Sequence, residues 1–240
     1  MAKFIGNLTL LGFLDGITAT GIIVSSVIFG LFSFYKARKL GAKLLATAGL
    51  MMIFVGCFWM GPAADFLSVL ITGSNLNPVH LYGWLSYMWI APAVITSFYL
   101  GAELMVPEKK KIIVVIYAIL GTIFEILIWT MPIGDTGVFT FTIRADGDLI
   151  DAGFNRANPA FWLIAIFLIS VLVFLVIGFG IKAKQATGEL RKKFGFLSLG
   201  TGIFFICCLF DSLFMPGIYL VAWRSVMMTY ALWMYLGLKT

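Results

Sequence analysis

The sequence predicts an all-α membrane protein built from seven transmembrane helices. Of its 240 residues, 61% are hydrophobic and only 12% are charged, and the mean hydropathy is +1.03. A soluble domain carries roughly a quarter charged residues, because its surface must face water. The composition therefore excludes the soluble classes, including the nucleic-acid-binding proteins that a pI of about 9.3 would otherwise suggest.

Seven apolar stretches are each long enough to cross the hydrocarbon core, which takes about 20 helical residues. Lipid offers no partner for an unpaired backbone group, so each stretch is expected to be helical. The predicted spans are 10–34, 42–63, 81–104, 112–132, 160–181, 194–214 and 217–237. They form a single membrane domain over 1–240, and the first apolar run is too long for a cleaved signal peptide.

The basic residues indicate the orientation of the chain. Twelve of the 17 Lys and Arg residues lie in the loops around 36–43, 109–111 and 182–193, whereas the alternate loops hold only Arg144 and Arg156. Loops rich in Lys and Arg stay in the cytoplasm. We therefore predict a multi-pass protein of the cell membrane with its N-terminus outside, and its basic loops would also attract anionic lipid head groups.

The longest loop, 133–159, is predicted to form an extracellular β-hairpin between the fourth and fifth helices. Apolar and polar residues alternate from Phe139 to Arg144, Asp146-Gly147 is a typical turn dipeptide, and Leu149-Ile150 would open the second strand. The spacing of Asp146, Asp148 and Asp151 also suggests calcium. A solvated turn is the simpler interpretation of these aspartates.

The chain matches itself at an offset of 146 residues. Residues that do not recur through hydrophobicity alone coincide in one register: Gly49 with Gly195, Gly56 with Gly202, Asp65 with Asp211, and Lys36–Arg38 with Lys182–Lys184. The segments 10–104 and 160–237 are therefore predicted to be repeated halves, with the helix 112–132 as a linker. An even number of spans separates the copies, so both halves point the same way across the membrane.

This 3+1+3 plan resembles seven-helix proteins of the transporter and opsin-like type, such as the SWEET sugar carriers and the opsins. The resemblance covers architecture over most of the chain. The repeated prolines of SWEET carriers are missing, since Pro62 and Pro92 meet Cys208 and Leu238 at the repeat offset. Microbial opsins hold retinal on a lysine in the last helix, where this chain has only Lys239, beyond its end. The resemblance thus implies a transporter or receptor without retinal, and we expect no cofactor.

Ionisable side chains inside the spans are candidates for ligand contacts, because an unpaired charge in lipid costs several kcal/mol. Asp65, His80, Asp211 and Arg224 are expected near the outer boundary, in an outward-facing polar pocket. Asp211 and Arg224 flank one connection and are predicted to form an ion pair, with either a structural role or a ligand contact. His80 is a candidate partner for Asp65.

Glu125 is the strongest candidate for a ligand contact. It lies deeper in its span, among Ile, Leu, Phe and Trp, and no basic residue of that span can approach it. It is expected to bind a cation, exchange a proton or contact a cationic cargo, unless it is a protonated acid bonded to a neighbouring helix. Tyr87, Trp89 and Tyr235 are further candidates, for stacking on a sugar or a flat molecule, although core packing would also explain them.

Two functions fit this pattern. The leading hypothesis is a small-solute transporter, in which the two three-helix halves rock around the polar pocket. The alternative is a receptor or sensor that binds an extracellular ligand and signals through a separate cytoplasmic partner at the loop from Lys182 to Lys193.

An enzyme is not expected, because no nucleophile with a nearby base, phosphate loop or metal cluster is recognisable. The three cysteines, Cys57, Cys207 and Cys208, lie in apolar runs and are expected to be packing residues. A structural or assembly subunit remains a further alternative to the two leading functions.

Overall fold

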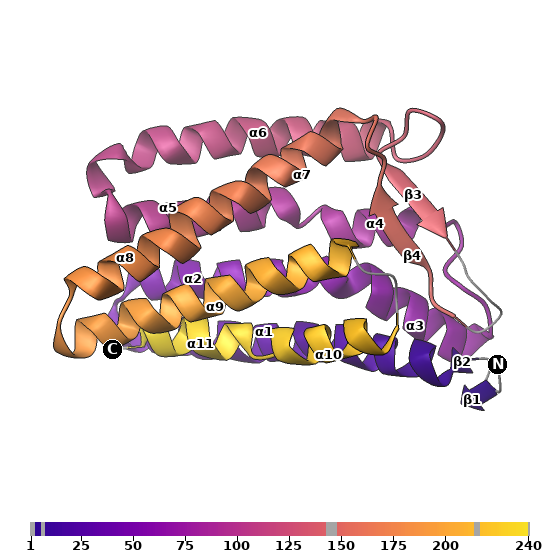
Figure 1. Ribbon diagram of the computed structural model, residues 1–240, viewed down its shortest axis with the longest axis horizontal. Coiled ribbons are helices and arrows are strands. Elements are labelled where there is room, and N and C mark those ends of the chain that lie inside the picture. Colours follow the sequence, from indigo (N-terminus) through magenta and orange to yellow (C-terminus); the bar gives the residue numbers. More distant parts are fainter. Residues whose placement is uncertain (1–2, 6–7, 143–147, 214–216, 240) are drawn as a thin grey trace.

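The computed structural model describes residues 3–5, 8–142, 148–213 and 217–239. The helices run side by side in an elongated bundle, with the two termini at opposite ends (Figure 1). Within the described residues, six helical segments are long and apolar enough to cross a membrane: Leu10–Leu40, Lys43–Thr72, His80–Met105, Pro107–Thr130, Pro159–Gln185 and Gly188–Leu213. This architecture fits the predicted all-α polytopic membrane protein.

The first three spans differ in regularity. The first is one helix, α1 (Leu10–Leu40). In the second, α2 (Lys43–Gly56) and α3 (Met60–Thr72) continue one another through a 3-10 turn. In the third, α4 (His80–Tyr87) and α5 (Ile90–Met105) are separated at Met88-Trp89. Pro92 follows this interruption and has no amide hydrogen to offer the carbonyl four residues earlier, which explains the break.

The later spans are α6 (Lys110–Thr130), then α7 (Pro159–Ser170) with α8 (Gly178–Gln185), then α9 (Gly188–Leu213). A π-helical stretch, Val171–Ile177, joins α7 to α8. The predicted seventh span, 217–237, forms two short helices, α10 (Ile218–Met227) and α11 (Tyr230–Leu238). A turn at Met228-Thr229 separates them, so this segment is not among the six long apolar helices.

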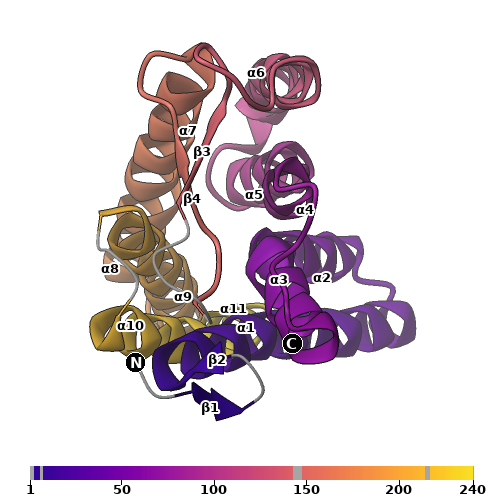
Figure 2. The same cartoon turned by 90° about the vertical axis from the view of Figure 1, so that its right-hand side faces the viewer.

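The spans close a ring. Each packs against the next along the chain, and α10 and α11 pack against α1 (Figure 2). One close approach is between α1 and α2, where a Cβ added at Gly49 would lie 2.8 Å from the carbonyl oxygen of Gly30. Small residues allow such an approach between membrane helices. A Cβ at Gly195, the predicted repeat partner of Gly49, would meet no atom of the described chain within 4 Å.

The predicted hairpin is confirmed in outline. β3 (Phe139–Thr142) pairs antiparallel with β4 (Asp151–Phe154). The expected start of the second strand at Leu149 was wrong, because Leu149 and Ile150 are buried ahead of β4 and the Ile150 amide donates to a side chain of α3. The predicted turn at Asp146-Gly147 lies outside the described residues. A short pair at the N-terminus, β1 (Lys3–Ile5) with β2 (Leu8–Thr9), was not predicted.

The two ends of the bundle differ. We call the end that carries the N-terminus and the β3–β4 hairpin the hairpin end, and the end where α5 meets α6 and α8 meets α9 the basic end (Figure 1). Large apolar side chains are exposed along the outside, among them Leu31, Ile119 and Ile169, which are 56–60% exposed. An apolar outer surface is what a lipid environment requires.

Candidate functional site

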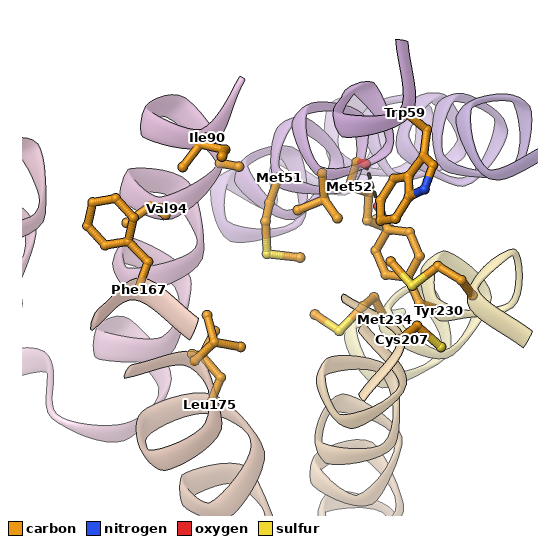
Figure 3. Close-up of a cluster of buried hydrophobic side chains, with 14 of the residues drawn as sticks. Met51, Met52, Trp59, Ile90, Val94, Phe167, Leu175, Cys207, Tyr230 and Met234 are labelled. Carbon is orange, nitrogen blue, oxygen red and sulfur yellow. Dashed lines mark hydrogen bonds between the residues drawn. The ribbon is translucent and has the colours of Figure 1, made fainter. Parts of the chain in front are cut away.

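A small cavity lies inside the ring. It is lined by residues from five spans: Met51, Val55, Ser97, Val171, Leu175, Thr201, Phe204, Tyr230 and Met234. Figure 3 shows Met51, Leu175 and Met234 reaching from three different spans toward the same interior region. The cavity measures ≈ 20 Å³, room for about one water molecule. The bundle therefore leaves only a small space at this position.

Three of the cavity-lining spans lose regular α-helical geometry close to the cavity. Val55 comes two residues before the 3-10 turn Cys57–Trp59. Val171 and Leu175 belong to the π-helical stretch, and Tyr230 is the first residue after the interruption between α10 and α11. π-Helical stretches and mid-helix 3-10 turns occur frequently at functional sites and hinges.

Side-chain hydroxyls from neighbouring spans bond the carbonyls at these irregular positions. Ser198 of α9 donates to the carbonyl of Val176 in the π-helical stretch at 2.9 Å. Ser25 of α1 donates to the carbonyl of Met228 at the interruption of the last span. Such bonds give a partner to backbone carbonyls that would be paired within the helix if it were regular. The irregular segments are therefore supported by the bundle.

At the hairpin end, Arg224 forms an ion triad with two aspartates. Its Nε donates to Asp211 at 2.7 Å, and its Nη1 donates to Asp15. The predicted pair of Asp211 and Arg224 is thus confirmed, and Asp15 joins it from α1. The Arg224 side chain is only 8% exposed, so its charge needs both partners. The triad ties α1 to α9 and α10.

Asp65 lies close to the hairpin but has backbone partners. Its side chain is fully buried and accepts the amide hydrogens of Leu76 at 2.7 Å and Ile150 at 2.8 Å. Asn75 donates to it from 3.0 Å. The expected pairing with His80 was wrong, since two backbone amides and a side-chain amide already satisfy the carboxylate. It joins α3 to the residues that precede β4.

Glu125 lies apart from both carboxylate sites. Its Oε2 accepts a hydrogen bond from Trp129 Nε1 at 3.1 Å, and its Oε1 is buried without a hydrogen-bond partner in the described chain. One turn earlier, a Cβ at Gly121 would lie 3.0 Å from the Ala91 Cβ. Glu125 therefore lies where α6 packs near the start of α5, and it is not among the residues that line the cavity.

His80 and the three candidate aromatics occupy separate places. The ring of His80 lies 4.5 Å from that of Trp84. Tyr87, Trp89 and Tyr235 pack on other aromatic rings, and none of them is among the described residues that line the cavity. Their neighbours are Phe139 and Phe154 for Tyr87, Phe54 for Trp89, and Phe29 for Tyr235.

The candidate calcium aspartates are only partly described, because Asp146 lies outside the described residues. Asp148 accepts a hydrogen bond from the Thr9 hydroxyl at 2.6 Å, which holds the loop to the start of α1. Within the described ranges, no group of three or more His, Cys, Asp or Glu residues is placed to hold a metal ion.

At the basic end, Glu103 pairs with Lys110 at 2.6 Å. The loop from Lys182 to Lys193 carries an exposed pair of Lys192 and Glu189.

Sequence reasoning missed the cavity, because its lining is mostly apolar. One signal was present in the repeat register. Val55 and Thr201 are 146 residues apart, and both line the cavity.

Comparisons with protein family models, with curated proteins and with solved structures find no match to this chain.

Proposed function

We propose that the protein is a small-solute membrane transporter, with its N-terminus outside and its C-terminus in the cytoplasm. The observation that carries the proposal is the central cavity, which is lined from five spans and lies beside three irregular helical segments. Irregular backbone within a membrane is tolerated where the bundle buries it or where it lines a cavity. Such segments are places where a helix can bend when a transporter changes access.

We further propose that residues 10–104 and 160–237 act as two like-oriented halves with 112–132 as a linker, as in SWEET-like carriers. The shared position of Val55 and Thr201 at the cavity supports this equivalence. The glycine pair of Gly49 and Gly195 supports it less, because only Gly49 lies at a close helix contact. The halves would therefore share a plan without sharing every packing contact.

The cavity lining favours an uncharged solute. Its polar contributors are the hydroxyl-bearing residues Ser97, Thr201 and Tyr230, and the other lining residues are apolar. A charged solute would be left there without a counter-ion, which is costly in an apolar interior. The charged residues expected to form the pocket, Asp65 and Asp211, have structural partners instead.

Flux into proteoliposomes tests the proposal. Vesicles containing the protein would be screened with radiolabelled neutral solutes that carry hydroxyl or amide groups. Ser97→Leu fills the cavity and should abolish the flux, because the lining has no spare room. Ser225→Leu is the matched control, since Ser225 is exposed on the outside of α10. Flux that survives Ser97→Leu would contradict a route through the cavity.

A receptor remains the second candidate, and one observation favours it. The hairpin end is held together by the buried ion triad, so opening the cavity outward by separating α1 from α10 would break the contact between Asp15 and Arg224. A receptor could bind its ligand without that step and signal through a partner at the loop from Lys182 to Lys193. Ligand binding without any flux, together with copurification of a cytoplasmic partner, would favour this function.

A further inference from the structure

A row of aromatic rings ends at a carboxylate on the side of the bundle formed by α4 and α6. The ring of Trp84 lies 4.5 Å from that of His80 and stacks on Trp129 at 5.0 Å. Both indole N–H groups are used: Trp84 donates to the carbonyl of Ile128 at 2.8 Å, and Trp129 donates to Glu125 at 3.1 Å. These two bonds fix the orientation of the rings.

One face of this row is open. Trp129 stacks on Trp84 with one face of its ring, yet Trp129 is 49% exposed. Its other face is therefore accessible. Ile126, on the same helix, is 57% exposed, so the accessible ring lies on the apolar outer surface.

The row ends at a carboxyl group, that of Glu125, which forms no ion pair within the described chain. Glu125 is not a member of any of the ion pairs found among the described residues. These pairs include Lys110 with Glu103, Lys192 with Glu189, and Arg224 with its two aspartates. A carboxylate next to aromatic rings is attractive to an organic cation, because the negative faces of the rings add to the attraction of the charge. The carboxyl group and the rings together are therefore suited to an organic cation from outside the chain.

The position of Trp129 along α6 indicates which kind of cation would bind. Trp129 is one residue from the end of α6 at the hairpin end. In a membrane helix this is the level of the interface, where lipid head groups lie and where tryptophans concentrate. We propose that Glu125, Trp129 and Trp84 form a binding site for the ammonium group of a zwitterionic phospholipid. The ammonium would lie over the open face of Trp129, close to Glu125.

This site is separate from the proposed transport route. Glu125, Trp84 and Trp129 are not among the described residues that line the cavity. The lipid site depends on the chain lying in a membrane and does not depend on solute flux. The two proposals can therefore fail independently.

Lipid binding by the detergent-solubilised protein, measured by native mass spectrometry, tests the site. Phosphatidylethanolamine, phosphatidylcholine and phosphatidylglycerol would be titrated with identical acyl chains, so that only the head group differs. Glu125→Gln keeps an oxygen acceptor for the Trp129 indole but removes the charge. It should weaken binding of the first ethanolamine or choline lipid about tenfold and leave binding of the glycerol lipid unchanged.

Trp129→Leu should reduce the same two affinities, because it removes the open ring. Trp162→Leu is the matched control: Trp162 is 62% exposed near the start of α7 at the same end, and its closest ring partner is Phe161. Equal lipid affinities in Glu125→Gln and wild type, or an equal loss in Trp162→Leu, would overturn the proposal. Ser97→Leu should bind all three lipids like wild type.

Free cations separate a lipid site from a site for a soluble amine. Tetramethylammonium and ethanolamine would be added at concentrations equal to that of the lipid. The proposal predicts that neither displaces the lipid, because the acyl chains on the outer surface contribute to its binding. Displacement at equal concentration would overturn the assignment to a lipid in favour of a soluble cation.

Discussion

The hairpin end and the basic end carry the same kinds of charged residue in opposite settings. At the hairpin end, Arg224 is 8% exposed between two aspartates, and Asp65 is fully buried among amide donors. At the basic end, the side chains of Lys192 and Glu189 are 67% and 79% exposed. Buried charges that lose a partner are costly, whereas exposed pairs contribute little. The hairpin end is thus held together by buried charges, whereas the charged side chains of the basic end contribute little to stability.

The largest effect is expected at the ion triad. Arg224→Met leaves Asp15 and Asp211 close together without their counter-ion, which should lower the free energy of unfolding by about 3–5 kcal/mol. Thermal unfolding in detergent would measure the loss. The triple variant Asp15→Asn, Arg224→Met, Asp211→Asn removes all three charges and should recover much of the stability. An Arg224→Met protein as stable as wild type would show that the triad does not hold this end together.

A smaller loss is expected at Asp65. Asp65→Asn replaces a carboxylate that accepts the amides of Leu76 and Ile150, and hydrogen bonds to a charged group contribute about 1.5–3 kcal/mol. The same thermal assay applies, with limited proteolysis to detect release of the segment before β4. Asp135→Asn is the control, since Asp135 is exposed in the same loop region. Identical behaviour of the two variants would remove the distinction between buried and exposed carboxylates.

The smallest effect is expected at the basic end. Lys192→Gln removes one member of an exposed pair, and its unfolding temperature should match that of wild type within error. If Lys192→Gln destabilised the protein as much as Asp65→Asn, the contrast between the two ends would be lost.

The sequence alone was sufficient to predict those structural features whose physical signal is local. The apolar runs predicted the spans, the alternation after Phe139 predicted the hairpin, and the short connection after Asp211 predicted its contact with Arg224. Helix ends were less predictable, since α1 continues to Leu40 and the second span to Thr72. Polar turns can continue a helix beyond the hydrocarbon core, so hydropathy alone does not mark these ends.

Other features depend on contacts that leave no local signal. Asp65 is satisfied by backbone amides, which every residue except proline carries, so Ile150 could not be singled out. Asp15 meets Arg224 from 209 residues away. The interruption at Met228-Thr229 contains no proline. The cavity is assembled from one or two residues on each of five spans, and only the repeat offset hinted that Val55 and Thr201 belong together.

Access to the central cavity tests the transport proposal most directly. Thr201→Cys, in a variant whose native cysteines Cys57, Cys207 and Cys208 are replaced by alanine, places one thiol at the cavity wall. Membrane-impermeant maleimides would be applied from each side of oriented vesicles. A transporter predicts labelling of Thr201→Cys from both sides. Labelling from the hairpin side alone would favour the receptor, and labelling from neither side would contradict both functions.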